Sequence, residues 1–161
     1  ALFETAGLEV QRSARICDDV WLKLWGNMTL NPISALTRAT SDAILDDPLT
    51  AHLMHEVMRE AARIGEVLGI RLPTTPEQRS AMTRKLGRFR SSMLQDLDAG
   101  RRLEIDALVG APWEIAQLAG LDTPWLGMLL GLARQLAANV APPEGAQPGA
   151  GPQASGVALT S

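Results

Sequence analysis

Residues 21–32 are WLKLWGNMTLNP, a stretch with a clear helical pattern. Its apolar residues recur at intervals of three and four, which is the pattern of an amphipathic helix. Lys23, Asn27 and Asn31 are spaced four apart, so they share one face of that helix. Asn31-Pro32 is expected to interrupt the helix, because proline lacks a backbone donor and disfavours helix at the preceding residue.

The polar face of this helix presents one ammonium, Lys23, and two carboxamides, Asn27 and Asn31, from an otherwise apolar surface. A desolvated ammonium is a usable proton donor or acceptor. The two carboxamides can orient a hydroxyl or a carboxylate by hydrogen bonds. The alternative is a solvated surface lysine and an ordinary asparagine at a helix end, since amphipathic helices are common and active sites are few.

No part of the chain shows apolar and polar residues alternating with period two, which predicts an all-α fold of several helices. Pro48, Thr75-Pro76 and Thr123-Pro124 are helix-start signals, and Gly100 is a helix-stop signal. The expected helices are residues 16–31 with 33–37 resuming, a short turn from Ser41, 48–69, 76 to about 90, 91–99, 104–119 with Pro112 as a position for a kink, and 124–139.

The bulk composition excludes several classes of protein. The 161 residues suffice for one domain, and the net charge of −3 gives no basis for binding nucleic acid. The longest apolar run, near residues 125–138, contains Arg134 and Gln135 and is too short and too polar to span a bilayer. The first ten residues lack the pattern of a secretion signal, and Cys17 is the single cysteine. A cytoplasmic protein without an internal disulfide is expected.

Two regions follow from the composition. Residues 1–140 are expected to form one helical domain. Residues 141–161 are rich in Pro, Gly, Ala and Ser and carry few large apolar side chains. We expect this segment to be a flexible tail, because it cannot bury enough surface to offset its ordering entropy.

A second chemically mixed stretch, SSMLQDLDAGRRLEID, occupies residues 91–106. It combines small hydroxyls, carboxylates and arginines next to a glycine, and Glu104 suits the positive end of a helix dipole. On its own it is more typical of a helix-loop-helix with capping residues and surface ion pairs. His52 and His55 are three apart on a helix, but no third ligand is evident, so a metal site is disfavoured.

Together, the two stretches resemble the C-terminal domain signature of the ketopantoate reductase (2-dehydropantoate 2-reductase) family. Order and spacing agree with that family from about residue 2 to residue 138. The matching residues are Lys23-Leu24, Asn27, Asn31 to Leu36 (NPISAL), Ser91 to Asp96 (SSMLQD), Gly100, Arg101, Glu104 to Asp106 (EID) and Thr123-Pro124.

The resemblance implies a helical domain like the C-terminal domain of 6-phosphogluconate dehydrogenase, preceded by a Rossmann domain that binds NADPH. It implies hydride transfer to the 2-keto carbon of ketopantoate, giving pantoate for pantothenate biosynthesis. By position, Lys23 matches the general acid, and Asn27 and Asn31 match substrate-binding asparagines. Ser92 matches the serine that binds the substrate carboxylate, and Glu104 matches a glutamate at the edge of the cofactor and active site.

Three departures from the family pattern change these expectations. No G-x-G-x-x-G occurs in the 161 residues, so NADPH is expected to bind mainly to an N-terminal domain missing from this chain, and the chain alone is expected to be inactive. Ser41 stands where some relatives have a further substrate-binding asparagine. Leu103 stands where threonine is common. The last two leave room for a small 2-keto acid other than ketopantoate.

An alternative function is a helical association module that works as a homodimer without catalysis of its own. Apolar helices around Trp113 and Trp125 are expected to expose patches that favour pairing. A folded but catalytically dead domain is a third possibility.

Overall fold

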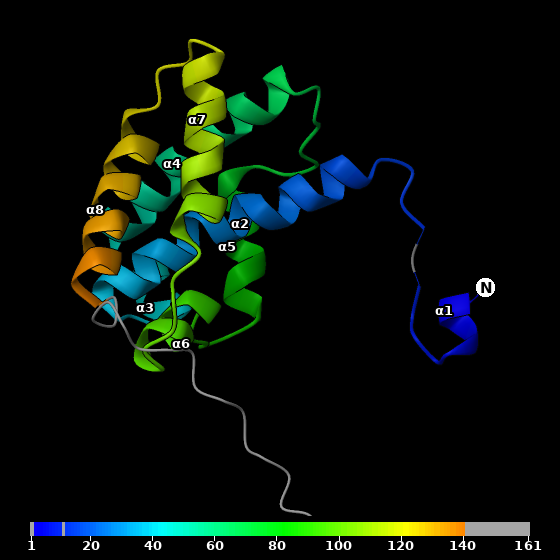
Figure 1. The fold of residues 1–161 in the computed structure, drawn as a ribbon, viewed down its shortest axis with the longest axis horizontal. Coiled ribbons are helices and arrows are strands. Elements are labelled where there is room, and N and C mark those ends of the chain that lie inside the picture. Colours follow the sequence, from blue (N-terminus) through cyan, green and yellow to red (C-terminus); the bar gives the residue numbers. More distant parts are fainter. Residues whose placement is uncertain (1, 11, 141–161) are drawn as a thin grey trace, which may run out of the picture.

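The computed structural model of the chain describes residues 2–10 and 12–140. Every regular element in these ranges is a helix, which confirms the predicted all-α fold class (Figure 1). The helices are α1 (Leu2–Thr5), α2 (Ile16–Thr37), α3 (Ser41–Asp46), α4 (Pro48–Val67), α5 (Pro76–Lys85), α6 (Ser92–Asp98), the π-helical turn η1 (Asp106–Gly110), α7 (Ala111–Leu118) and α8 (Pro124–Val140). The predicted tail, 141–161, lies outside the described residues.

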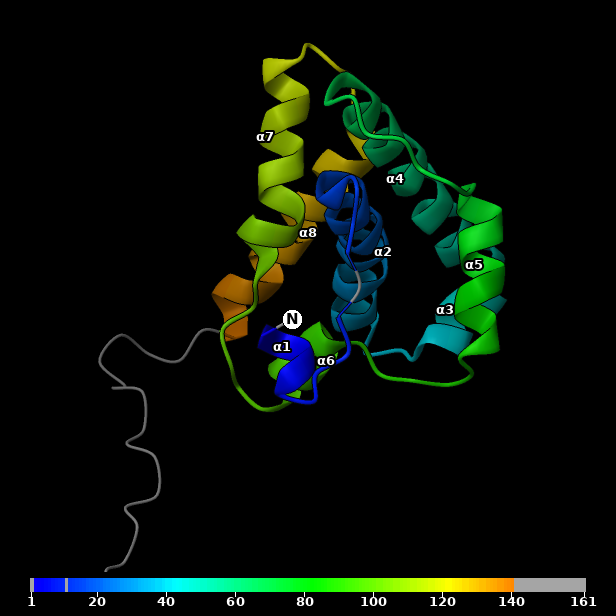
Figure 2. The same ribbon diagram turned by 90° about the vertical axis from the view of Figure 1, so that its right-hand side faces the viewer.

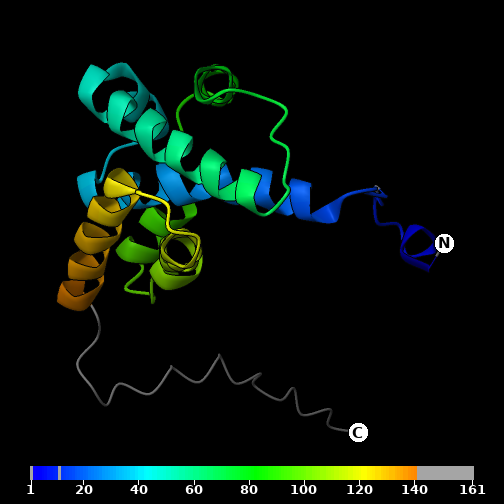
Figure 3. The same cartoon turned by 90° about the horizontal axis from the view of Figure 1, so that it is seen from above.

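Helix α2 is the central element, and α4, α6 and α8 pack around it. Figure 2 shows α2 between α4 and α5 on one side and α7 and α8 on the other, and Figure 3 shows α4 crossing it from above. Trp25 and Met28 of α2 are fully buried, and the indole Nε1 of Trp25 donates to the carbonyl of Met58 on α4 over 2.7 Å. The apolar face predicted from residues 21–32 therefore forms the core.

The predicted interruption at Asn31-Pro32 is wrong, because α2 continues through Pro32 to Thr37. Proline inside a helix costs about 3 kcal/mol or more, through a lost hydrogen bond and a clash with the preceding turn. Here Met28 and Ile33, on either side of the proline, are both buried in the same core. Burying a large apolar side chain contributes about 1.5–3 kcal/mol, so the packing on both sides offsets the proline. Asn31 is consequently a mid-helix residue.

Helix α5 begins as the sequence predicts but ends earlier. Thr75 and Gln78 form a capping box at its start, in which the backbone amide of Gln78 donates to Thr75 Oγ1 over 3.3 Å. The helix ends at Lys85 rather than near residue 90. Gly87, with a φ of +72°, adopts the left-handed conformation that terminates helices and that glycine adopts without strain. Residues 88–91 are therefore free to turn toward α6.

The predicted helix over 104–119 divides into η1 and α7. Ala111 donates its backbone amide to the carbonyl of Asp106, a wider turn than that of an α-helix. Pro112 follows directly and lacks a donor, so the wide turn accommodates it near the start of α7.

The side chain that caps α8 is not that of Thr123, which the sequence predicts. Thr123 Oγ1 is buried and has no hydrogen-bond partner among the described residues. Glu60 of α4 takes its place, since its carboxylate accepts from the backbone amides of Trp125 over 3.1 Å and Leu126 over 2.8 Å. A carboxylate satisfies the free donors and the positive end of the helix dipole there. Within the described ranges, no helix combines the length and the apolar character that a membrane span requires.

Candidate functional site

The three residues of the predicted polar face of α2 differ in how deeply they are buried. Asn31 is buried, with 6% of its surface exposed, Asn27 is half-buried, and Lys23 is exposed. The prediction of a desolvated Lys23 is therefore wrong for this chain. The reason is the position of the helix, whose first turns project beyond the core, so that Ile16 and Val20 are exposed as well.

Asn31 and Ser92 meet although they lie 61 residues apart. The Asn31 side-chain amide donates to Ser92 Oγ over 3.3 Å. Ser92 is the first residue of α6, and the hydroxyl of Ser91 caps that helix by accepting from the amide of Leu94 over 3.1 Å. The cap fixes the start of α6 and so places Ser92 beside α2.

A cavity of about 270 Å³ lies at this junction, and we call it the Asn31–Ser92 cavity. Its polar wall combines two carboxamides, several hydroxyls and two guanidinium groups, and its apolar wall comes from α2, α4 and the segment between α5 and α6. The polar residues are Asn27, Thr29, Asn31, Arg79, Ser80, Thr83, Arg90, Ser91 and Ser92, and the others are Gly26, Leu30, Met54, Met58, Leu86 and Phe89. Three of the five predicted site residues therefore share one cavity.

Lys23 lines a neighbouring hollow of about 420 Å³ together with Arg12, Asp19 and Arg79. Arg79 is the residue common to this Lys23 hollow and the Asn31–Ser92 cavity. The two openings thus adjoin each other along α2, with Asn27 between Lys23 and Asn31.

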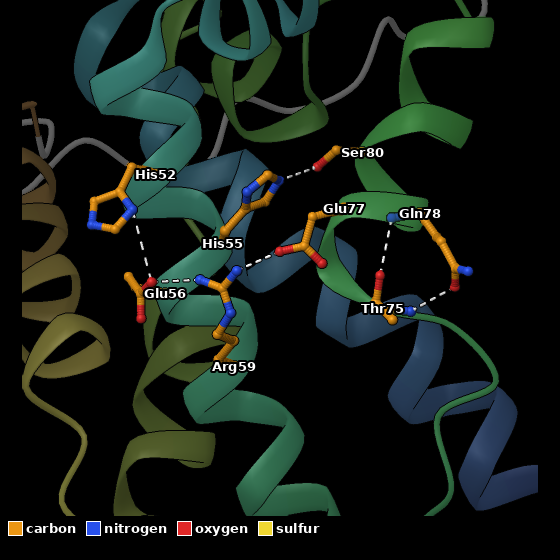
Figure 4. Close-up of polar contacts among 8 residues, drawn as sticks. All are labelled: His52, His55, Glu56, Arg59, Thr75, Glu77, Gln78 and Ser80. Atoms are coloured by element: carbon orange, nitrogen blue, oxygen red, sulfur yellow. Dashed lines mark hydrogen bonds and ion pairs between the residues drawn. The ribbon is translucent and has the colours of Figure 1, made fainter.

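Ser80 joins the cavity wall to α4. Its hydroxyl is 2.8 Å from His55 Nε2, as Figure 4 shows. Burial lowers the pKa of His55, while the nearby Glu77 carboxylate opposes that shift. The neutral imidazole is therefore favoured near pH 7, and it holds Ser80 by one hydrogen bond. The other histidine, His52, packs edge-on against Trp125 at 5.7 Å, and no group of three or more potential metal ligands lies together in the described part of the chain.

The structure does not bring Glu104 into either opening. Glu104 is exposed just before η1, where its carbonyl accepts from the amide of Leu108 over 3.0 Å. Ser41 is also committed elsewhere, because its hydroxyl donates to the carbonyl of Gly87 and accepts from the amide of Phe89, both over 3.1 Å. Leu103 is buried in the core.

Sequence reasoning missed Arg79 and the Ser80–His55 contact. One signal for Arg79 was available in the sequence. Positions three and four residues away on its helix hold Thr75, Pro76, Met82 and Thr83, so it has no acidic neighbour on its own face. Nothing in the sequence brings Ser80 to His55, since that contact depends on how α5 packs against α4.

Comparisons with known proteins agree with this architecture. The sequence profile of the family described as "Ketopantoate reductase PanE/ApbA C terminal" matches residues 15–137. A 2-dehydropantoate 2-reductase of Mesorhizobium japonicum is 45% identical over 132 residues, which are 82% of this chain and 40% of that relative. A crystal structure from Ralstonia solanacearum, of a protein assigned to the ketopantoate reductases, shares 49% identity and superposes with a TM-score of 0.80 over 86% of this chain and 42% of that one.

A complex of D-mandelate dehydrogenase with NADH and anilino(oxo)acetate superposes with a TM-score of 0.75 at 22% identity, over 85% of this chain and 58% of that one, which is a likeness of fold alone. The chain spans about 40% of the length of the curated relative from Mesorhizobium. The matched segment contains both α2 and α6, the helices that meet at Asn31 and Ser92, and the chain therefore belongs to the family of ketopantoate reductase C-terminal domains.

Proposed function

We propose that this domain binds a small 2-keto acid in the Asn31–Ser92 cavity and protonates its reduced carbonyl, as the substrate half of an NADPH-dependent reductase. The main support for this proposal is the Asn31–Ser92 hydrogen bond at the wall of a cavity whose volume is about 270 Å³. Pockets for drug-sized ligands span roughly 300–1,000 Å³, so this cavity suits a smaller molecule. Ketopantoate is the first candidate, because relatives are named 2-dehydropantoate 2-reductase.

The spacing along α2 constrains how such a substrate lies. Lys23 precedes Asn31 by eight residues, which is about 12 Å along the helix axis. The substrate carboxylate is proposed to lie near Asn31 and Ser92. The keto carbon is bonded directly to that carboxylate, so the keto oxygen lies close to Asn31 as well, and the Lys23 side chain has to extend along α2 past Asn27 to bring its ammonium to that oxygen. A cation directed at the forming alkoxide stabilises the transition state more than the ground state.

The exposed position of Lys23 supports a site completed by a second domain. The Lys23 hollow carries the cations Arg12 and Lys23 against one carboxylate, Asp19, apart from Arg79, which it shares with the Asn31–Ser92 cavity; this charge suits an anionic nicotinamide nucleotide. Reduced nicotinamide supplies the hydride when it is bound. In this proposal residues 1–140 form the substrate-binding domain, a Rossmann domain provides most of the contacts to NADPH, and Glu104 meets the cofactor from its exposed position.

A binding experiment tests the proposal on the chain itself. We expect ketopantoate to shift the NMR resonances of Asn27, Asn31 and Ser92 in a saturable way. Asn31→Ala should weaken that binding about 5- to 10-fold, the usual effect of losing one hydrogen bond near 1 kcal/mol. Asn139→Ala is the matched control, because Asn139 is exposed on α8 away from the cavity. Equal binding by wild type and Asn31→Ala would contradict the proposal.

One observation favours a second function, association with another copy of the chain. An apolar depression of about 330 Å³ lies between α2, α4 and α8, and its α8 wall includes Trp125, Met128 and Leu132, of which Met128 and Leu132 are 53% and 58% exposed. A ketopantoate reductase of Staphylococcus aureus with the same fold is described as dimeric. We propose that this surface pairs with its copy, and Leu132→Glu should then shift the sedimentation equilibrium toward monomer. A wild-type chain that stays monomeric at every concentration would contradict it.

A further inference from the structure

We propose that Arg79 binds the carboxylate of the substrate and thereby makes the Asn31–Ser92 cavity selective for acids. This inference rests on the proposed function and adds a binding residue to it. Arg79 lies outside the two sequence stretches that resemble the family, and its Nε has no hydrogen-bond partner.

The first observation is the environment of the Arg79 guanidinium. Its Nε has no accessible surface and no hydrogen-bond partner, and the side chain makes no ion pair within the part of the chain that the structure describes. A buried donor without an acceptor costs free energy, and such groups are rare in folded proteins. Of the three unpartnered buried side-chain atoms there, the Arg79 nitrogen is the one that carries charge.

The second observation is that the other guanidinium of the cavity already has an ion-pair partner. Arg90 pairs with Asp98 of α6, whose carboxylate also pairs with Arg38. Lys23 faces the adjoining hollow and does not line the Asn31–Ser92 cavity. Among the described residues that line this cavity, Arg79 is therefore the cation without an ion-pair partner.

The third observation is that Arg79 is held in place. Arg59 of α4 pairs with Glu77, and His55 of α4 lies within hydrogen-bond distance of Ser80, so that the first turn of α5 is tied to α4 at two points (Figure 4). Arg79 lies between these two ties and crosses to α2, where its Nη2 would be 3.0 Å from a Cβ placed on Gly26. The glycine leaves room for the guanidinium against the helix. Such pre-organisation lowers the entropic cost of binding a ligand.

The chemistry of the wall selects a carboxylate rather than a phosphate. Planar guanidinium groups match the geometry of carboxylates with paired hydrogen bonds. Asn31 and Ser92 add neutral donors within the same small cavity, which suits a singly charged planar group. A phosphate of the nucleotide, being larger and more highly charged, is the competing ligand that the experiment must separate.

The test uses three probes on the chain itself: 2-oxoisovalerate, its neutral methyl ester, and inorganic phosphate. Arg79→Gln should weaken binding of the acid about 10- to 100-fold, as expected for the loss of a charge-assisted hydrogen bond, and should leave the ester within about twofold. Arg79→Lys should recover part of the affinity for the acid. Lys85→Gln is the matched control, because it removes one exposed charge from the same helix without lining the cavity.

The outcomes distinguish failure of the Arg79 assignment from failure of the proposed function. Equal binding of the acid by wild type and Arg79→Gln overturns the assignment of Arg79 while the proposed function stands. Loss of phosphate binding alone overturns it in favour of a nucleotide contact. If wild type binds neither acid nor ester, the proposed function fails and the assignment falls with it. Since the Arg79 side chain makes no ion pair or hydrogen bond in the described structure, and glutamine keeps the backbone hydrogen bonds of this position, Arg79→Gln should unfold at the same urea concentration as wild type, which excludes misfolding as the cause.

Discussion

The side-chain amide of Asn31 and the hydroxyl of Ser92 lie 3.3 Å apart and join the middle of α2 to the first residue of α6. Both residues line the same cavity, and together they link the two sequence motifs that carry the family resemblance. A double-mutant cycle of Asn31→Ala and Ser92→Ala, measured by urea unfolding, should give a coupling of about 0.5–1.5 kcal/mol. Asn139→Ala paired with Ser92→Ala should be additive. Additivity in the first cycle would mean that the contact does not form in solution.

The approach of α2 to α4 depends on a glycine. A Cβ on Gly65 would lie 2.8 Å from Nε1 of the buried Trp21, whereas a Cβ on Gly131 of α8 would meet nothing within 4 Å. Gly65→Ala should therefore lower the free energy of unfolding by about 1–3 kcal/mol through overpacking. Gly131→Ala should raise it by about 0.5–1 kcal/mol, because alanine favours helix. Urea denaturation of the two variants tests the pair, and equal stabilities would contradict the packing described.

Glu60 should make stability depend on pH in an unusual direction. Burial raises the pKa of its carboxyl above the ordinary value of 4.5, and the hydrogen bonds from Leu126 and Trp125 only partly oppose that shift. The folded protein then binds this proton more tightly than the unfolded chain does. The contribution of Glu60 is therefore greatest below pH 4.5 and is lost as the pH rises through the raised pKa.

Glu60→Gln isolates this effect, because an amide does not titrate. The free energy of unfolding of wild type minus that of Glu60→Gln should fall as the pH rises from about 4.5 through the folded pKa, and should then level off. Asp47 and Glu77, whose pKa values are lowered by hydrogen bonds to backbone groups, titrate in both proteins and cancel in the difference. A difference that rises over this range would reverse the assignment.

Local signals in the sequence predicted the helix boundaries well where a capping residue, a proline or a glycine alone sets the boundary. Pro48 and Thr75 begin helices as expected, and Gly100 has a positive φ of 64° after α6. The predictions failed where packing overrides local preference. Core burial on both sides of Pro32 carries α2 through the proline, and Glu60, which lies far away in sequence, replaces Thr123 as the cap of α8.

The candidate site was likewise predictable where local helix geometry positions the residues, and not where packing does. The spacing of Asn27 and Asn31 identified one helix face, and family resemblance added Ser92 from a second helix; these three residues do share a cavity. The depth of Lys23 was mispredicted, because helical periodicity does not show how far a helix extends past the core. Arg79 comes from α5, whose position is fixed by contacts to α4 that no local pattern encodes.

Turnover shows whether Lys23 protonates a 2-keto acid held by Asn31 and Ser92, as proposed. The measurement is NADPH oxidation with ketopantoate in a polypeptide that joins this domain to the proposed nucleotide-binding domain. Lys23→Ala should lower kcat about 100- to 10,000-fold, the usual contribution of a general acid, with NADPH binding intact. Lys85→Ala should match wild type, and the 161-residue chain alone should show negligible turnover. Wild-type turnover by Lys23→Ala would contradict the account.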